Sequence, residues 1–142
     1  MAPVLMLSVA LTLGLAACAT PSAPTAVYAP PPAVLVEAWL GPAEEVQTDR
    51  VMIFYRAYGG GASRLGAWLS PTPPTSRDSV RQSLALPPEN IAEAYSVVTV
   101  PAGTRMKVGI AAPAFGQPGG GRQVQLLQLI PTDSFSDPIP LP

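Results

Sequence analysis

The sequence predicts an α+β domain that is mostly β, with about five strands and one or two short helices. Two observations support this prediction. Apolar runs are short and are separated by proline and glycine, of which the chain of 142 residues has 19 and 12, and this spacing favours strands over long helices. One segment, from Ser76 to Ala85, instead places apolar residues four positions apart, as on one face of a helix.

The first elements are short and end at turn residues. Val34 to Leu40 is compatible with a strand or a short helix. Glu44-Glu45 resembles a carboxylate pair, but neighbouring residues of an extended chain point to opposite faces, so we interpret it as a solvated loop. Arg50 to Tyr58, rich in β-branched and aromatic residues, predicts a buried strand. Gly66 to Ser70 predicts a shorter strand, which Pro71 stops.

The second half continues with a helix and more strands. Ser76 can cap the helix, and Val80 and Leu84 lie on one of its faces. Three further apolar runs predict strands: Tyr95 to Val100, Met106 to Ala111 and Gln123 to Ile130.

The N-terminus has the pattern of a bacterial lipoprotein signal. Cys18, the only cysteine, ends Leu15-Ala16-Ala17-Cys18, and lipid transfer and cleavage require this leucine, the small residues and the cysteine. The apolar run from Val4 to Leu15 is too short to span a ~30 Å hydrocarbon core. We therefore predict a signal peptide over residues 1–17 and lipidation of Cys18. No Lys or Arg precedes Cys18, so an ordinary secretory signal, or a buried helix that happens to contain a cysteine, is the alternative.

Lipidation implies a permanent membrane anchor, because three acyl chains enter the bilayer at ~0.8 kcal/mol per buried methylene. Ala19 follows the cysteine in place of the aspartate that resembles an inner-membrane retention signal. This predicts a location in the bacterial cell envelope, on the outer membrane, with the leaflet left open. Residues 18–33 are rich in Pro and Ala and predict a linker, and residues 34–142 form a single domain.

Composition excludes several classes of function. The net charge of −1 offers no basic patch for nucleic acid. The chain has no histidine, which excludes imidazole-based serine triads and the usual zinc and haem sites. Once Cys18 is acylated no thiol is left, so disulfides, thiolate catalysis and cysteine metal sites are excluded as well.

The segment IAAPAFGQPGGGRQ, from Ile110 to Gln123, resembles the strand, loop and strand that carry the functional glutamine in NAD glycohydrolase domains of the tuberculosis necrotizing toxin type. FYRAYGG (54–60) and GAWLSP (66–71) resemble the arginine-bearing and serine-bearing strands of that domain and of ADP-ribosyltransferase folds. The resemblance covers about residues 46 to 130. It implies an ADP-ribosyltransferase-like domain over residues 34–142, NAD as substrate with no cofactor, and an immunity protein as partner.

The resemblance also implies residue roles. Arg56 would bind the NAD pyrophosphate or ribose, Ser70 would support the nicotinamide-ribose pocket, and Gln123 would contact the ribose beside the scissile bond. Trp68 and Phe115 would line the pocket around the nicotinamide ring. The remaining substrate-binding candidates are Tyr58, Gly119, Gly120 and Gly121, and consecutive N–H groups of the glycine triplet can form an anion-binding nest at the rim of the cleft.

These residues also have simpler interpretations, since Arg56 could face solvent and the aromatic residues could belong to the core. The chemistry nevertheless suits a chain without histidine, because nicotinamide leaves as a neutral ring from a cationic glycoside and needs no general acid. Glutamine at position 123, where transferases often have glutamate, favours hydrolysis of NAD. A non-enzymatic envelope lipoprotein that binds a partner, and a protein ADP-ribosyltransferase, are the alternative functions.

Overall fold

Residues 37–142 are described by the structure, which is a computed structural model. The predicted signal peptide, Cys18, the linker and residues 34–36 lie outside these residues. Within them the chain forms seven strands, one α-helix and one short 3-10 helix. The predicted class, a small α+β domain that is mostly β, is confirmed.

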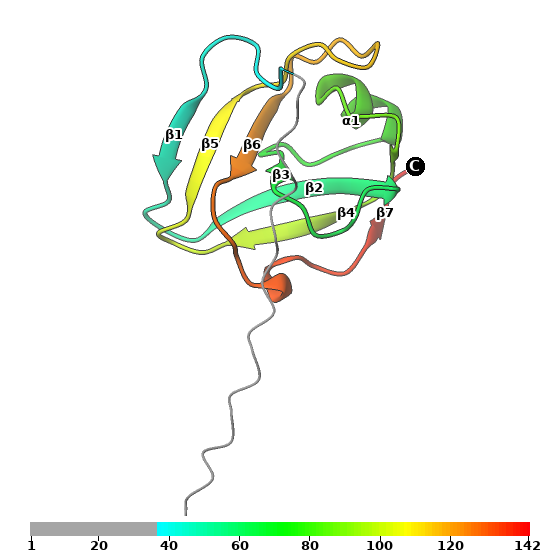
Figure 1. Cartoon of the computed structure of the whole chain (residues 1–142). Coiled ribbons are helices and arrows are strands. Elements are labelled where there is room, and N and C mark those ends of the chain that lie inside the picture. Colours follow the sequence, from blue (N-terminus) through cyan, green and yellow to red (C-terminus); the bar gives the residue numbers. More distant parts are fainter. Residues whose placement is uncertain (1–36) are drawn as a thin grey trace, which may run out of the picture.

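The strands form two antiparallel sheets that cross one another (Figure 1). The first has the order β1-β5-β6-β3 and consists of β1 (Glu44–Gln47), β5 (Arg105–Ile110), β6 (Arg122–Leu126) and β3 (Trp68–Leu69). The second has the order β2-β4-β7 and consists of β2 (Met52–Gly60), β4 (Asn90–Val100) and β7 (Ile139–Pro140). The helices are α1 (Arg77–Ser83) and η1 (Thr132–Ser134).

The residue after β3 joins the two sheets. Ser70 and Tyr55 of β2 exchange two backbone hydrogen bonds of 2.8 Å, so the chain leaves one sheet and at once borders the other. The apolar core fills the space between the sheets, where alternate residues of β4 and β6 meet. Its buried members are Phe54, Ala67, Leu69, Val98, Val100, Met106, Val124, Leu126, Ile130 and Phe135.

A bulge bends the end of β2 next to the cavity described below. The register with β4 shifts between Tyr58 and Gly60, and Gly59 and Gly60 have φ of 147° and 62°. A Cβ on Gly59 would lie 2.9 Å from the backbone nitrogen of Glu93, so this position requires glycine. The buried Asn90 amide fixes the bulge from the other strand, since it donates to the Ala57 carbonyl and accepts from the Ala92 N–H.

Helix α1 begins and ends in capped turns. The Ser76 hydroxyl accepts a hydrogen bond from the Ser79 N–H at 3.2 Å, as the sequence predicts. At the other end, the Leu86 N–H binds the Arg81 carbonyl, and the Ala85 N–H binds the carbonyl of the helix's penultimate residue. This is a Schellman motif with Ala85 at φ 47°, where glycine is usual. The motif turns the chain away from the helix axis at Leu86.

Two strands were not predicted. The sequence predicts a loop at Glu44-Glu45, but this pair belongs to β1, whose residues pair with β5 from Arg105 to Val108. The segment is only four residues long and both glutamates are exposed, so it carries no apolar alternation. β7 contains a proline and pairs with β4 at two positions only. The last predicted strand was too long, because β6 ends at Leu126 and not at Ile130.

Residues 37–40, which the sequence left open between strand and helix, are extended. Trp39 forms a bridge with Ala111, and the Leu40 N–H donates to the Ile110 carbonyl at 2.9 Å. We call this segment the N-terminal arm. In residues 37–142 no helix is long and apolar enough to cross a membrane.

Candidate active site

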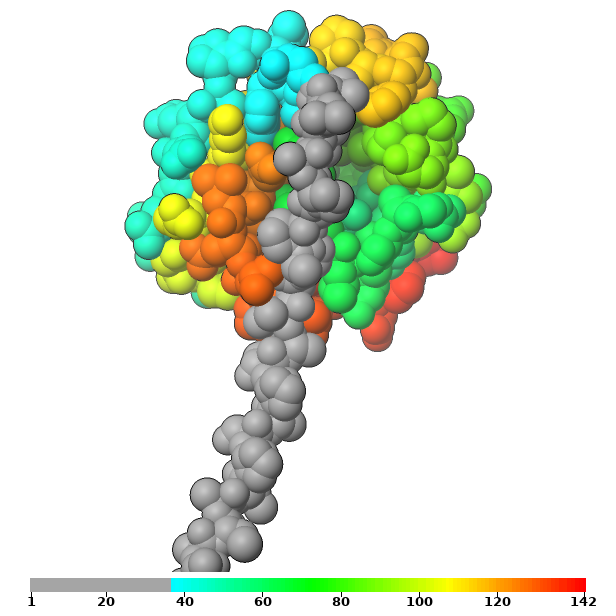
Figure 2. Space-filling model, viewed as in Figure 1, coloured from blue at the N-terminus to red at the C-terminus, as the bar shows by residue number. Residues whose placement is uncertain are grey.

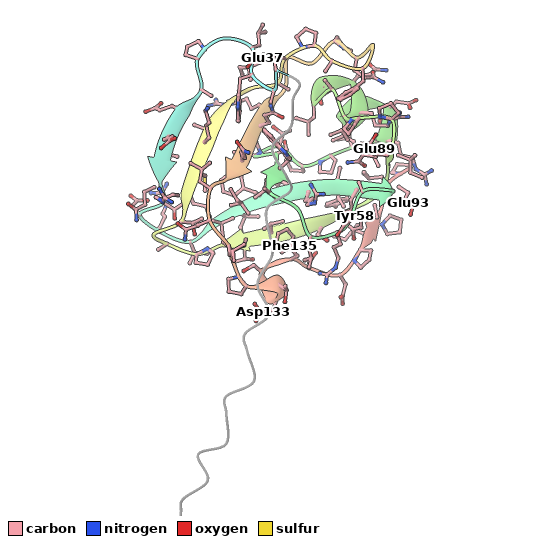
Figure 3. The ribbon with its side chains drawn as sticks, viewed as in Figure 1. Glu37, Tyr58, Glu89, Glu93, Asp133 and Phe135 are labelled. Carbon is pink, nitrogen blue, oxygen red and sulfur yellow. The ribbon has the colours of Figure 1, made fainter. Side chains whose placement is uncertain are left out.

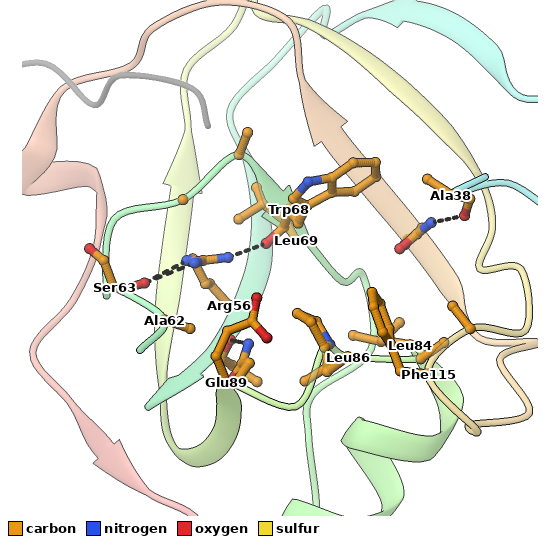
Figure 4. Close-up of a pocket in the computed structure, with 18 of the residues that line it drawn as sticks. Ala38, Arg56, Ala62, Ser63, Trp68, Leu69, Leu84, Leu86, Glu89 and Phe115 are labelled. Atoms are coloured by element: carbon orange, nitrogen blue, oxygen red, sulfur yellow. Dashed lines mark hydrogen bonds between the residues drawn. The ribbon is translucent and has the colours of Figure 1, made fainter. Parts of the chain in front are cut away.

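A cavity of about 420 Å³ opens where β2, β3, the turn after α1 and the loop between β5 and β6 meet (Figure 4). Its size lies in the range of small-molecule sites. Four of the predicted site residues line it together: Arg56, Trp68, Phe115 and Gln123. They come from three strands and a loop that are distant in sequence, so the fold itself brings them to one place.

Arg56 lies on the wall that β2 contributes, held by backbone carbonyls. Its Nε and Nη2 donate to the Ser63 carbonyl at 3.1 and 2.8 Å, and its Nη1 donates to the Trp68 carbonyl at 3.1 Å (Figure 4). The guanidinium lies against Gly66, where any Cβ would overlap it. Gly66 thus makes room for the cation, and the two carbonyls fix its plane at the cavity wall.

Gln123 lies on β6 across the cavity from Arg56 and is 8% exposed. Its Nε2 donates to the Ala38 carbonyl of the N-terminal arm at 2.6 Å. Within residues 37–142 its Oε1 accepts no hydrogen bond, and it is not among the buried unpaired atoms. The oxygen is therefore accessible to a hydroxyl group in the cavity.

Two aromatic residues contribute to the cavity walls. Trp68 packs against Trp39 of the arm, with ring centroids 5.5 Å apart and planes tilted by 46°. Phe115 is 48% exposed and has φ of 54°. It sits with Gly116, at φ 73°, in a two-residue turn closed by hydrogen bonds between Ala114 and Gln117. A strained, exposed aromatic side chain at a cavity is typical of a functional position.

The turn after α1 supplies an apolar side of the cavity, through Leu84 and Leu86. Two carboxylates, Glu37 and Glu89, also line it and are exposed. Figure 3 shows Glu37 at the top of the molecule and Glu89 beside the end of α1. In Figure 4 the Glu89 carboxylate turns into the cavity on the side of Arg56. The cavity therefore combines one cation, two anions, apolar surface and an amide oxygen.

Ser70 and Tyr58 do not line this cavity. The Ser70 hydroxyl is buried and forms a local turn, in which it accepts from the Thr72 N–H and donates to the Thr72 carbonyl. The Tyr58 hydroxyl is buried beside Ser96, whose Oγ lies 3.3 Å away. Both side chains contact the interior of the fold and would reach a ligand only through other residues.

The glycine triplet 119–121 is also absent from the cavity lining. The N–H groups of Gly119 and Gly121 donate to the Gln82 and Ser83 carbonyls at the end of α1, and that of Gly120 donates to the Ala111 carbonyl. The bond from Gly121 satisfies the Ser83 carbonyl, one of those that a helix end leaves unpaired, and the bond from Gly119 adds a second donor to the Gln82 carbonyl. The triplet thus ties the loop to the helix, and its amides do not form the anion-binding nest that glycine content suggested.

Some cavity residues had no signal in the sequence. The Ala38 carbonyl is a backbone group, and every residue type has one, so its role at the cavity cannot be predicted from the sequence. Glu89 follows two prolines and looks like a solvated turn residue. The spacing of Val80 and Leu84 places both on one face of the helix. This spacing predicts packing against the core and gives no sign that Leu84 lines a cavity. In residues 37–142 no group of three or more His, Cys, Asp or Glu is placed to hold a metal ion.

Comparison with known proteins agrees with the resemblance seen in the sequence. Residues 66–134 match the family model described as tuberculosis necrotizing toxin. No curated protein matches the chain. One solved structure is similar, "Structure of Tne2 in complex with Tni2", with a TM-score of 0.61 and 19% identity over 74% of this chain and 98% of that chain. At this identity the likeness shows a common fold.

Proposed function

We propose that this chain, whose residues 66–134 belong to the tuberculosis necrotizing toxin family, hydrolyses NAD to nicotinamide and ADP-ribose in the cavity between β2 and β6. The observation that carries the proposal is the meeting of Arg56 and Gln123 in one cavity with two aromatic side chains. The domain would act as a toxin effector.

The residues suit the chemistry of N-glycoside cleavage. As nicotinamide leaves, positive charge develops on the ribose, and neutral or negative oxygen atoms stabilise it. The Oε1 of Gln123 is such an oxygen, and it can also accept a hydrogen bond from a ribose hydroxyl. Arg56 supplies the positive charge that holds the diphosphate. Trp68 and Phe115 offer flat apolar surface for the nicotinamide ring.

Purified residues 33–142 should release nicotinamide and ADP-ribose from NAD, measured by chromatography of the products. Gln123→Ala should lower kcat by a factor on the order of a hundred, because a transition-state contact of this kind is worth ~3 kcal/mol. Gln125→Ala is the matched control, since Gln125 lies on the same strand and does not line the cavity. It should retain the parent kcat.

The alternatives give different results. Transfer of labelled ADP-ribose to a protein acceptor in a lysate, with little release into solution, would identify a protein ADP-ribosyltransferase. If the folded domain consumes no NAD over hours and labels no protein, the hydrolase proposal is wrong and the function is that of a non-enzymatic binding module.

The proposal extends to location and partner. The lipoprotein pattern ending at Cys18 supports anchoring in the bacterial envelope, on the outer membrane. The similar Tne2 was solved with a partner, Tni2. This supports an immunity protein as a partner of the present chain, which a pull-down with the purified domain from the producing cell would identify.

A further inference from the structure

We propose that the N-terminal arm, residues 37–40, is a positioning element of the active site that holds the Gln123 amide in its working orientation. The catalytic part of this inference rests on the proposed function, whereas the orientation itself does not. The arm lies outside residues 66–134, so the family match does not include it.

The arm is docked by its backbone. The Leu40 N–H donates to the Ile110 carbonyl at 2.9 Å, and the Ala38 carbonyl accepts from the Ala112 N–H at 3.1 Å. These bonds extend the pairing of β5 past its end, directly beside the cavity. In Figure 2 residues near 40, in cyan, adjoin the loop that follows β5, in yellow to orange, at the top of the molecule.

The Trp39 ring anchors the arm. Gly109 of β5 lies beneath it, and a Cβ at this position would lie 2.8 Å from Cε3 of Trp39 and 3.1 Å from Cβ of Ala43. The Lys107 ammonium lies 5.8 Å from the centre of the ring, within the range of a cation–π contact. The glycine and the lysine both belong to β5, so the ring is seated on a strand of the sheet.

The Ala38 carbonyl determines which end of the Gln123 amide faces the cavity. A carbonyl oxygen only accepts, so the group 2.6 Å from it must be the NH₂ of the side chain. Placing Oε1 there would bring two acceptors together. Because the terminal torsion of glutamine is otherwise broad, the carbonyl is what selects the orientation. It leaves Oε1 as the acceptor that a ligand in the cavity meets.

Displacing the arm should therefore affect catalysis more than binding. Arg56, which holds the diphosphate in the proposed function, donates to the carbonyls of Ser63 and Trp68, and both of these residues lie outside the arm. A displaced arm lets the Gln123 amide rotate while Arg56 stays in place. We expect a loss in kcat with little change in KM.

The test uses Gly109→Ala, which introduces a methyl group where the Trp39 ring lies. Gly109 does not have a positive φ, so the backbone accepts alanine. The matched variants are Trp39→Ala and the double variant, in which the methyl group has no ring to displace. Gly109→Ala should lower kcat by about tenfold to a hundredfold in the parent and by less than about twofold in the Trp39→Ala background.

A second measurement reports the amide directly and needs no turnover. In the parent protein, the Gln123 side-chain NH₂ and the Ala112 N–H should exchange slowly with solvent in NMR spectra, because both are bound to the Ala38 carbonyl. Gly109→Ala should accelerate both. Gly109→Val, with its larger side chain, is the second variant. If both variants leave the two groups protected, the Trp39 ring does not hold the arm against Gln123 and the proposal is wrong.

The outcomes separate the two proposals. Faster exchange at both groups with an unchanged kcat would overturn the positioning role. An equal loss of kcat in both backgrounds would overturn it as well, since the effect would then not pass through Trp39. If the parent itself does not consume NAD, the proposed function fails, while the exchange measurement still decides whether the arm orients the amide.

Discussion

At the scale of single residues, the geometry of the site depends on glycine positions, where any side chain would occupy space that a site residue needs. Gly66 is the clearest case, because the Arg56 guanidinium occupies the space where a Cβ would be. The arginine is recognisable in the sequence, but the glycine that accommodates it looks like any turn residue. The position of the charge in the cavity thus depends on Gly66 as much as on Arg56.

We expect Gly66→Ala to displace Arg56 and raise the KM for NAD by about tenfold to a hundredfold, the equivalent of losing a charge-assisted contact of ~1.5–3 kcal/mol. Steady-state kinetics measures this effect. In an Arg56→Ala background the same change should have little further effect on KM. If Gly66→Ala raises KM equally in both backgrounds, it does not act through Arg56.

Phe115 makes a second residue-scale prediction. Its φ of 54° is costly for a phenylalanine but common for asparagine. Phe115→Asn should therefore raise the free energy of unfolding by about 1 kcal/mol and at the same time raise the KM for NAD. Phe115→Tyr, which keeps both the ring and the strain, should change neither by much. A less stable asparagine variant in urea unfolding would contradict the strain argument.

At the scale of elements, the sequence predicts the strands with apolar alternation and misses those without it. The alternation of buried and exposed residues in β4 and the β-branched and aromatic residues of β2 are sufficient to predict these two strands, and Ser76 predicts the start of α1. β1 and β7 are held by their partners, β5 and β4, rather than by their own composition. Such strands have no signal in a single sequence.

The same limit applies to the site. The resemblance pointed to Arg56, Trp68, Phe115 and Gln123, which do share a cavity. It also pointed to Gly119–Gly121, whose amides instead bind carbonyls at the end of α1 and the Ala111 carbonyl, just past β5. Glycine content indicates where a backbone can approach closely, but tertiary contacts decide which group it approaches.

The end of α1 offers a prediction about stability. Ala85 has φ of 47° in the Schellman motif, a position where glycine avoids a steric penalty. Ala85→Gly should raise the free energy of unfolding by about 0.5–1 kcal/mol, measured by chemical denaturation. Ala67→Gly, at a fully buried residue without positive φ, is the control and should destabilise the fold. A destabilised Ala85→Gly variant would show that the alanine methyl group contributes more by packing than it costs.

At the scale of the whole molecule, the chain couples the site to its own N-terminus. The arm that orients Gln123 is the first described segment and follows the predicted linker after residues 34–36. If the chain is lipidated, the cavity therefore lies close to the point where the tether joins the domain. Access to substrate would then depend on which side of the membrane displays the tether.

The anchor itself is testable because Cys18 is the only cysteine of the chain. Cys18→Ala should move the protein from the membrane pellet to uncleaved or unanchored forms, and it should abolish palmitate incorporation. Ser22→Ala, in the predicted linker, is the control and should fractionate like the parent. A Cys18→Ala protein that still incorporates palmitate would exclude lipidation at this position.

Two of the four strands that border the sheets, β1 and β7, have a consequence for behaviour at high local concentration. β1 presents Glu44 and Glu45, both exposed, at one border of its sheet, and β7 places Pro140 at the border of the other. An unpaired border strand is a template for another chain, and charges and prolines are what natural sheets use to block it. If Cys18 anchors the chain, its copies share a two-dimensional surface and meet far more often than in bulk solution. A chain with a net charge of only −1 has little general repulsion to keep copies apart, so these residues should contribute to resistance against edge-to-edge aggregation at β1 and β7.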